Sequence, residues 1–138
     1  MVNAFTVDVE EWFHVCGVDD RLPASSWETL ESRVVPTTRA VLDDLAEFGH
    51  RATFFIVGWV AERHPTLVRE IADAGHEIGL HGFWHRRLFE LTPDTFRQDL
   101  RDNIAVLQAA GAGPIVSFRA PEWSLNERAP WALPIVVE

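Results

Sequence analysis

The fold is decided by residues 52–80, which read "ATFFIVGWVAERHPTLVREIADAGHEIGL". The run "ATFFIVG" (52–58) is apolar and rich in β-branched and aromatic residues, as in a buried strand. The segment "HPTLVREIADAG" (64–75) predicts a helix that Pro65 can start, and "HEIGL" (76–80) predicts a second short strand. A strand, a helix and a strand in this order predict two parallel strands joined by a right-handed crossover.

The same alternation continues on both sides of this unit. Residues 4–9 predict a strand and residues 34–50 a helix. Residues 93–111 predict another helix with Thr92 as its N-cap, and residues 115–119 predict a fourth strand. The expected apolar faces of these two helices carry Val41, Leu42, Leu45 and Phe48 in the first and Phe96, Leu100, Ile104 and Leu107 in the second. Four strands alternating with three helices predict an open α/β sheet or part of a β/α barrel.

The composition predicts one acidic globular domain. The chain has 138 residues, of which 47% are hydrophobic, so it can build a core. Its formal net charge of -9 argues against nucleic acid or an anionic membrane as the main partner, because both favour clustered basic residues. Cys16 is the single cysteine, which excludes an intrachain disulfide, and we interpret it as a small buried residue. We see no charged leader followed by an apolar run and no membrane-spanning stretch, and therefore expect a cytoplasmic protein.

Polar residues gather where three of the predicted strands end, which is where α/β folds carry their chemistry. The first strand runs into Asp8, Glu10 and Glu11, the third into His81 and then His85, and the fourth into Arg119. Side chains alternate along a strand, so Asp8 and Glu10 point to the same side. We expect these segments to meet at one rim of the sheet.

Each of these signals is weak when it is taken alone. Two histidines four apart can share one metal ion, but such pairs are common, and acidic residues at a strand end are often simply solvated. Together, two neutral histidines and one carboxylate make the open three-ligand arrangement of a hydrolytic zinc site. A second carboxylate can then act as a base, and an arginine can orient it. We interpret the other histidines as ordinary polar residues: His14, His50, His64 and His76.

Four segments in order carry a more specific pattern: "FTVDVEEWF" (5–13), "ATFFIVGWVAERHP" (52–65), "GHEIGLHGFWHRRL" (75–88) and "FRAPEWS" (118–124). They resemble the polysaccharide deacetylases of carbohydrate esterase family 4, which carry the NodB homology domain. More narrowly, they resemble the branch with D-V-E in its first motif, often linked to exopolysaccharide loci with exosortase systems. The resemblance covers about residues 3–133. It implies a distorted (β/α) barrel, usually of seven strands, and a metal, commonly zinc, that serves to remove acetyl groups from glycans.

The resemblance also assigns roles to the residues at the rim. His81 and His85 match the metal pair, Asp8 matches the base that activates the attacking water, and Arg119 matches the arginine that holds this base. The common first motif reads T-F-D-D-G, with its second aspartate as a metal ligand. Val9 occupies that position here and cannot bind a metal, so we expect Glu10 to be the third ligand.

Further residues would contact the acetylated glycan. The backbone N–H of Glu122 falls where the family places an oxyanion donor. Pro121 and Trp123 would shape the wall of the groove, and Trp12 could stack on a sugar ring.

The length raises the question of completeness. A full (β/α) barrel needs about 250 residues, so we expect residues 1–138 to form the N-terminal half of a truncated domain. The family's catalytic acid is a histidine from a late motif, and no histidine follows His85. We also expect Pro134 to interrupt the last helix. Weak turnover and self-association through an exposed barrel edge are therefore expected of this chain.

Two other functions stay open. The chain could be a glycan-binding or regulatory remnant that keeps the groove but has lost turnover, which an activity assay beside a metal assay would separate. It could instead be a related metal-dependent amidohydrolase acting on a small cyclic amide, which a panel of substrates would decide.

Overall fold

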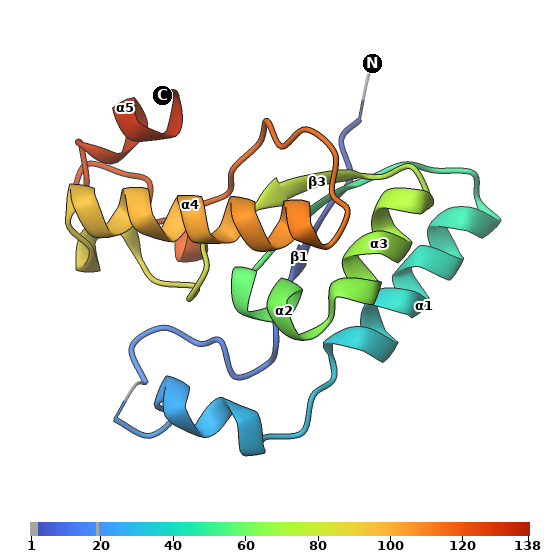
Figure 1. Ribbon diagram of the computed structural model, residues 1–138, viewed down its shortest axis with the longest axis horizontal. Coiled ribbons are helices and arrows are strands. Elements are labelled where there is room, and N and C mark those ends of the chain that lie inside the picture. The colour runs from blue at the N-terminus through green and yellow to red at the C-terminus, as the bar shows by residue number, and fades with distance from the viewer. Residues whose placement is uncertain (1–2, 19) are drawn as a thin grey trace.

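The centre of the computed structural model, which describes residues 3–18 and 20–138, is a parallel sheet (Figure 1). Its strands lie in the order β1 (Thr6–Val9), β2 (Thr53–Ile56) and β3 (Glu77–Leu80). The predicted parallel crossovers are confirmed, and so is the α/β fold class. A partial sheet of three parallel strands is consistent with an incomplete NodB barrel.

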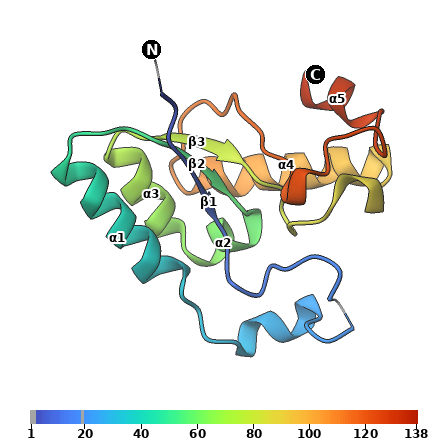
Figure 2. The ribbon, with the colours of Figure 1, turned by 180° about the vertical axis from the view of Figure 1, so that it is seen from behind.

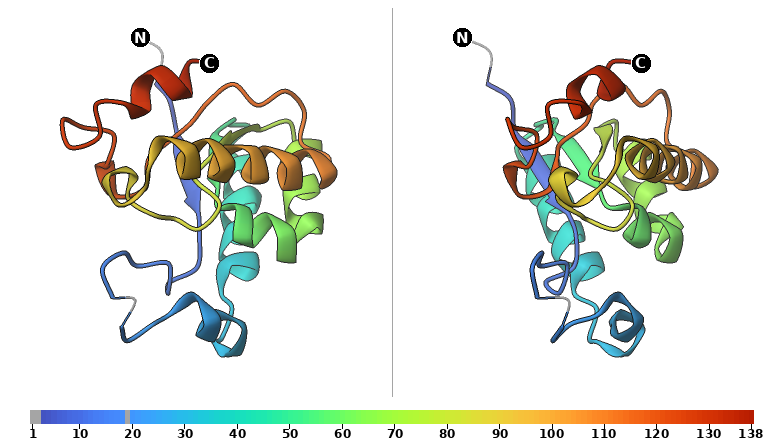
Figure 3. Two further views of the ribbon diagram at one scale, coloured as in Figure 1. Left: turned by 60° about the vertical axis from the view of Figure 1, so that its left-hand side comes forward. Right: turned by 90° about the vertical axis from the view of Figure 1, so that its left-hand side faces the viewer.

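Helices pack against this sheet and against one another. They are α1 (Val34–Glu47), α2 (Gly58–Arg63), α3 (Pro65–Asp73), α4 (Pro93–Ala109) and α5 (Ala132–Val136), with the 3₁₀ helices η1 (Ala24–Thr29), η2 (Leu88–Glu90) and η3 (Pro121–Trp123). Seen from behind in Figure 2, the strands lie in front of α4. Figure 3 shows α5 near the first half of α4, away from α1. None of the helices in the described residues has the length and apolar character needed to cross a membrane.

Buried apolar residues of the strands and helices form the main core. Phe54 and Ile56 of β2 and Ile71 of α3 are 0% exposed, as is Leu107 of α4. Burying side chains of this size stabilises the fold by roughly 1.5–3 kcal/mol each. The core therefore fixes α3 and α4 against the sheet and holds the carboxyl ends of the strands in place.

The start of α4 confirms the predicted N-cap. The hydroxyl of Thr92 accepts the backbone N–H of Thr95 at 3.2 Å, and the hydroxyl of Thr95 accepts the N–H of Thr92 at 2.8 Å. Pro93 takes the first helical position, where no backbone N–H is needed. A stable start for α4 matters because this helix carries a side chain that supports the site described below.

The predicted fourth strand is wrong. Residues 115–119 form a single bridge, between Leu80 and Phe118. Leu80 donates its N–H to Ser117 and accepts the N–H of Arg119, both at 2.9 Å. Only β3 pairs with this segment among the described residues, and a run with one partner satisfies too few backbone groups to count as a strand. The two hydrogen bonds still place Arg119 beside the carboxyl end of β3.

Three local expectations are also wrong. Phe48 is 67% exposed, because α1 ends one residue earlier and the apolar face ends with Leu45. Gly58 starts α2 instead of ending the second strand. Pro134 lies inside α5 without interrupting it, because it is in the first turn, where a backbone N–H has no helical acceptor.

We predict that Gly58→Ala destabilises the protein by about 1–3 kcal/mol through overpacking. A Cβ atom at Gly58 would lie 2.5 Å from Cδ2 and 2.9 Å from Cα of Phe83. Urea denaturation measures the loss, and Gly113→Ala is the matched control, because a Cβ atom there meets nothing within 4 Å. Equal losses in both variants would contradict the packing argument.

Candidate metal and catalytic site

The carboxyl ends of β1 and β3 and the segment after Phe118 line one cavity of about 750 Å³. Five residues of the predicted strand ends line it: Asp8, Glu10, His81, His85 and Arg119. The parallel register explains this, because strands that run the same way end at the same edge of the sheet. Glu11 does not line it, because it is 2% exposed and its carboxylate accepts the hydroxyl of Ser32 and the backbone N–H of Arg33. Val9 points the other way and is 1% exposed, so the expected alternation of Asp8 and Glu10 about it is confirmed.

Glu10, His81 and His85 form a compact set of ligand atoms. One ligand atom from each lies within 4.8 Å of the others, and Oε2 of Glu10 is 2.8 Å from Nε2 of His85. Oε2 of Glu10 is buried and has no hydrogen-bond donor among the described residues. A buried carboxylate oxygen without a donor is costly, and a cation would remove this cost. Two imidazoles and one carboxylate also match the ligand set of an open divalent-metal site, so these residues fit such an ion.

His81 is oriented by the backbone of the neighbouring segment. Its Nδ1–H donates to the carbonyl oxygen of Arg119 at 2.8 Å, which leaves the lone pair on Nε2. That Nε2 lies 3.8 Å from Oδ2 of Asp8. Burial is the main cause that lowers the pKa of His81, and the nearby His85 lowers it further. His81 is therefore neutral at pH 7 and presents its Nε2 lone pair to the cavity.

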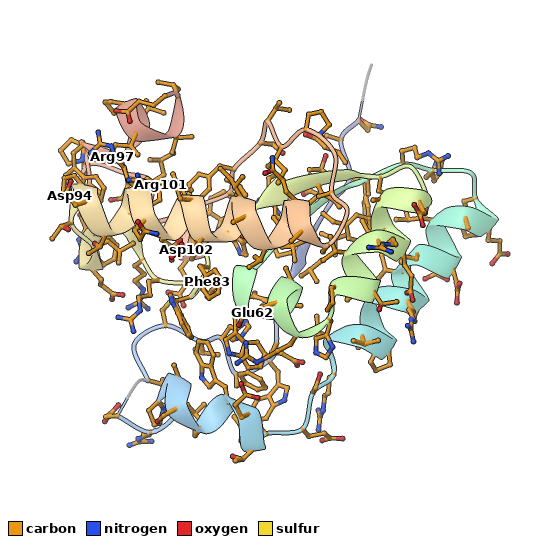
Figure 4. The ribbon with its side chains drawn as sticks, in the orientation of Figure 1. Glu62, Phe83, Asp94, Arg97, Arg101 and Asp102 are labelled. Carbon is orange, nitrogen blue, oxygen red and sulfur yellow. The ribbon has the colours of Figure 1, made fainter. Side chains whose placement is uncertain are left out.

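Asp99 of α4 holds the loop between the two histidines. Its carboxylate accepts the N–H of Phe83 at 2.8 Å and the N–H of Trp84 at 3.4 Å. Figure 4 shows the labelled Phe83 beside the middle of α4. Burial raises the pKa of Asp99, although the two backbone N–H groups act in the opposite direction. Nothing in the sequence indicates this role, because Asp99 is one of several acidic residues on its helix.

The start of α2 fixes the same loop from another side. The N–H of Gly58 donates to Gly82 at 2.9 Å, and that of Trp59 donates to Phe83 at 3.0 Å. His85 itself has a φ of 53°, an uncommon value for a side chain of this size. The thiol of Cys16 donates to the carbonyl oxygen of His85 at 3.0 Å and helps to hold this conformation.

Asp8 and Arg119 form the predicted ion pair. Nη1 of Arg119 is 2.6 Å from Oδ1 of Asp8, and Nη2 donates to the hydroxyl of Thr6 at 2.7 Å. The pair is only partly buried, because 34% of the Asp8 side chain and 35% of the Arg119 side chain are exposed. Both side chains line the cavity and are partly exposed, so a ligand in the cavity can reach them.

The side chain of Glu122 holds two other segments of the chain through its carboxylate. Oε2 of Glu122 lies 2.6 Å from Nη2 of Arg87, and Oε1 accepts the N–H of Cys16 at 3.2 Å. Its backbone has a φ of 47°, and its own N–H meets no acceptor within residues 3–18 and 20–138. The N–H at the predicted oxyanion position can therefore donate to a ligand. The carboxylate is already bound to Arg87 and to the N–H of Cys16.

The aromatic and proline predictions have different outcomes. Trp123 is 94% exposed and lines the cavity, as expected of a groove wall. Pro121 is buried and is not among the residues that line the cavity. Trp12 lines a neighbouring hollow, and its Nε1–H donates to the carbonyl oxygen of Glu31 at 2.9 Å. Only Trp123 of these three therefore borders the cavity that holds the metal-ligand set.

His14 lies in the cavity wall, although the sequence indicated an ordinary polar residue. It is 3% exposed, and burial lowers its pKa to about 3, with His85 and His81 contributing. Its position four residues after Glu10, in the loop that follows β1, is the signal that could have placed it near the site.

Known proteins match this chain in sequence and in fold. A sequence profile of the polysaccharide deacetylase family matches residues 21–133, so Asp8 and Glu10 lie outside the matched segment. A peptidoglycan-N-acetylglucosamine deacetylase of Bacillus cereus is 34% identical over 98 residues, which are 69% of this chain and 35% of the relative. A chitooligosaccharide deacetylase of Sinorhizobium fredii is 38% identical over 85 residues, 61% of this chain and 40% of the relative.

A solved structure matches almost the full length of this chain. The crystal structure of a Mycobacterium smegmatis protein, assigned as a polysaccharide deacetylase, superposes with a TM-score of 0.73 at 35% identity. The match covers 96% of this chain and 46% of that one. The chain thus spans less than half the length of each of these three proteins.

We predict that one divalent ion binds per chain and that His81→Ala abolishes this binding, because the variant loses one of three ligands. Asp8→Asn should retain the ion, since the structure pairs Asp8 with Arg119. Titration calorimetry with zinc, with metal analysis of the dialysed protein, checks both. Loss of metal in Asp8→Asn with retention in Glu10→Gln would reverse the roles of the two carboxylates.

We predict that Asp99→Asn weakens zinc binding about 10- to 100-fold, because an amide cannot accept both backbone N–H groups of the ligand loop. Asp102→Asn is the matched control, since Asp102 lies on the same helix and bonds to Gln98 instead. Zinc affinity is measured by competition with a chelator of known affinity. Equal affinities in the two variants would show that Asp99 does not position the loop.

Proposed function

Because this chain belongs to the polysaccharide deacetylase family, we propose that it serves in the metal-dependent removal of acetyl groups from an N-acetylated polysaccharide or oligosaccharide. One observation carries the proposal: the Asp8–Arg119 pair and the Glu10, His81 and His85 set share a single cavity. The relatives named above act on peptidoglycan and chitooligosaccharides, which makes N-acetylglucosamine polymers the first substrates to test. An exopolysaccharide with the same acetamido groups fits the D-V-E form of the first motif.

Different residues around the cavity would have different roles in amide hydrolysis. A divalent ion held by the three ligands, for which we propose zinc, would supply Lewis-acid chemistry to the attacking water and the acetyl carbonyl. Asp8 lies next to this set, and Arg119 holds one of its oxygens, so the other oxygen can accept a proton from the water. The same contact fixes the direction in which the carboxylate of Asp8 faces the cavity.

The backbone N–H of Glu122 is our candidate for the oxyanion donor. An N–H without a competing acceptor can bind the oxygen on which charge develops, and removal of one such donor typically costs about 10²- to 10³-fold in kcat. The ion pair between Arg87 and Glu122 holds this backbone in place. The glycan would lie over Trp123, whose exposed ring can stack on the apolar face of a sugar.

The leaving amine also needs a proton. In the family this acid is a histidine from a late motif, and the sequence contains no histidine after His85. General acid catalysis typically contributes about 10²- to 10⁴-fold, so we expect the 138 residues alone to turn over slowly. A relative's C-terminal half, which carries such a histidine, would supply the missing group.

We predict that acetate release from acetylated chitooligosaccharides is weak for this chain and rises at least 100-fold when the C-terminal half of a close relative is appended. In the extended protein, Asp8→Asn should lower kcat at least 100-fold while zinc stays bound, because only the base is lost. Asp73→Asn, at the surface end of α3, is the control.

Full activity from the 138-residue chain as a monomer would require an acid among its own residues. Glycan binding with no acetate release in the extended protein would favour a non-catalytic remnant.

A further inference from the structure

Three residues at the site have a backbone conformation that side chains rarely adopt. His85, Glu122 and Trp123 have φ values of 53°, 47° and 56°, and they are the non-glycine residues with positive φ in the described part of the chain. They carry a metal ligand, the candidate oxyanion donor and the exposed ring of the groove wall. Such conformations persist only where surrounding contacts hold them, so the contacts that hold these two segments matter for the site.

The guanidinium of Arg87, two residues after His85, joins the two segments. Its Nε donates to Oε2 of Glu122 at 2.8 Å, and its Nη2 lies 2.6 Å from the same oxygen. The next residue adds a second link, because the N–H of Leu88 donates to the hydroxyl of Ser124 at 3.1 Å. The two segments therefore stay together when Arg87 is changed, and only the finer placement of the backbone depends on its side chain.

The same guanidinium also holds the loop that follows β1. Nη2 of Arg87 donates to the carbonyl oxygen of Cys16 at 3.2 Å, while the N–H of Cys16 donates to Oε1 of Glu122 at 3.2 Å. Each of these three residues is thus bonded to the other two. The thiol of Cys16 then donates to the carbonyl oxygen of His85, which connects this ring of contacts to the backbone of a metal ligand.

Gly17 leaves the space that the guanidinium of Arg87 needs. A Cβ atom at Gly17 would lie 3.1 Å from Nη1 and 3.4 Å from Nη2 of Arg87. A methyl group there would press against the guanidinium and shift it from Cys16 and Glu122. The loop after β1 is therefore shaped to admit this one side chain.

We propose that Arg87 is a positioning residue that sets the direction of the metal ligand His85 and the place of the backbone N–H of Glu122. Arg87 is not among the described residues that line the main cavity, so it acts through its partners. The role at His85 concerns metal binding alone, whereas the role at Glu122 rests on the proposed deacetylase function. Ion pairs that are partly exposed contribute little to stability, so the effect of removing Arg87 falls on the site.

The first test measures metal binding by the chain itself. Arg87→Gln should weaken zinc binding about tenfold, as for other groups that support a metal ligand, and should change the visible absorption of the Co²⁺-loaded chain, which reports the ligand geometry. Arg97→Gln is the matched control. Arg97 lies on α4 (Figure 4) and bonds to Glu138 through Nε at 3.1 Å and Nη2 at 2.8 Å. Its loss should leave the zinc affinity and the Co²⁺ spectrum unchanged.

A pair of glycine variants tests the same contact without changing Arg87. Gly17 and Gly49 have φ values of 79° and 65°, so alanine strains the backbone at both, but a Cβ atom at Gly49 meets nothing within 4 Å. Gly17→Ala should therefore weaken zinc binding, while Gly49→Ala should not. Urea denaturation shows which variants fold, and this pair decides if Arg87→Gln does not. Zinc affinities and Co²⁺ spectra that are equal within each variant–control pair would overturn the proposal.

The second test uses the protein extended with the C-terminal half of a relative, at saturating zinc. Arg87→Gln should lower kcat about tenfold or more and leave KM nearly unchanged, because an oxyanion donor acts in the transition state. Equal kcat values in Arg87→Gln and Arg97→Gln would overturn the role at Glu122. If the unsubstituted extended protein releases no acetate, the deacetylase proposal fails, and the zinc and Co²⁺ measurements still decide the role at His85.

Discussion

The hydrogen bond from Nδ1–H of His81 to the carbonyl oxygen of Arg119 joins the two halves of the candidate site. Arg119 is placed by the bridge to Leu80, the residue directly before His81, and its side chain then holds Asp8 on the opposite strand. The direction of one imidazole and the position of the base are thus set by the same short stretch of backbone. A shift of the segment that carries Arg119 would move both at once.

Two residues that line the main cavity, Glu10 and His14, and Trp27 beside His14 carry buried polar atoms without a partner among the described residues. Each such atom costs about 1–3 kcal/mol, a large share of the stability of a domain this small. Packing supplies the compensation, since Phe13, Trp27 and Trp59 surround His14 in edge-on and tilted contacts. The protein therefore tolerates local instability where it needs groups ready for a ligand.

The features that could be predicted from the sequence are those that the residue pattern of a short segment determines by itself. The alternation of strands and helices and the polar ends of the strands are properties of short segments, and they placed Asp8, Glu10, His81, His85 and Arg119 together. Pairing of residues 115–119 depends on neighbours that no local pattern reveals, so a strand was expected where one bridge exists. The support from Asp99 and the pairing of Arg87 with Glu122 join segments far apart in the chain and were equally invisible.

The hydrogen bond from the thiol of Cys16 to His85 has a consequence for redox chemistry. Burial and the nearby Glu122 raise the pKa of Cys16 to about 12. Since the thiolate is the reactive form, this shift keeps Cys16 in its less reactive thiol form at pH 7. Oxidants and alkylating agents therefore find almost no target at this position. The loop that carries His85 should keep its shape in reducing and oxidising surroundings alike.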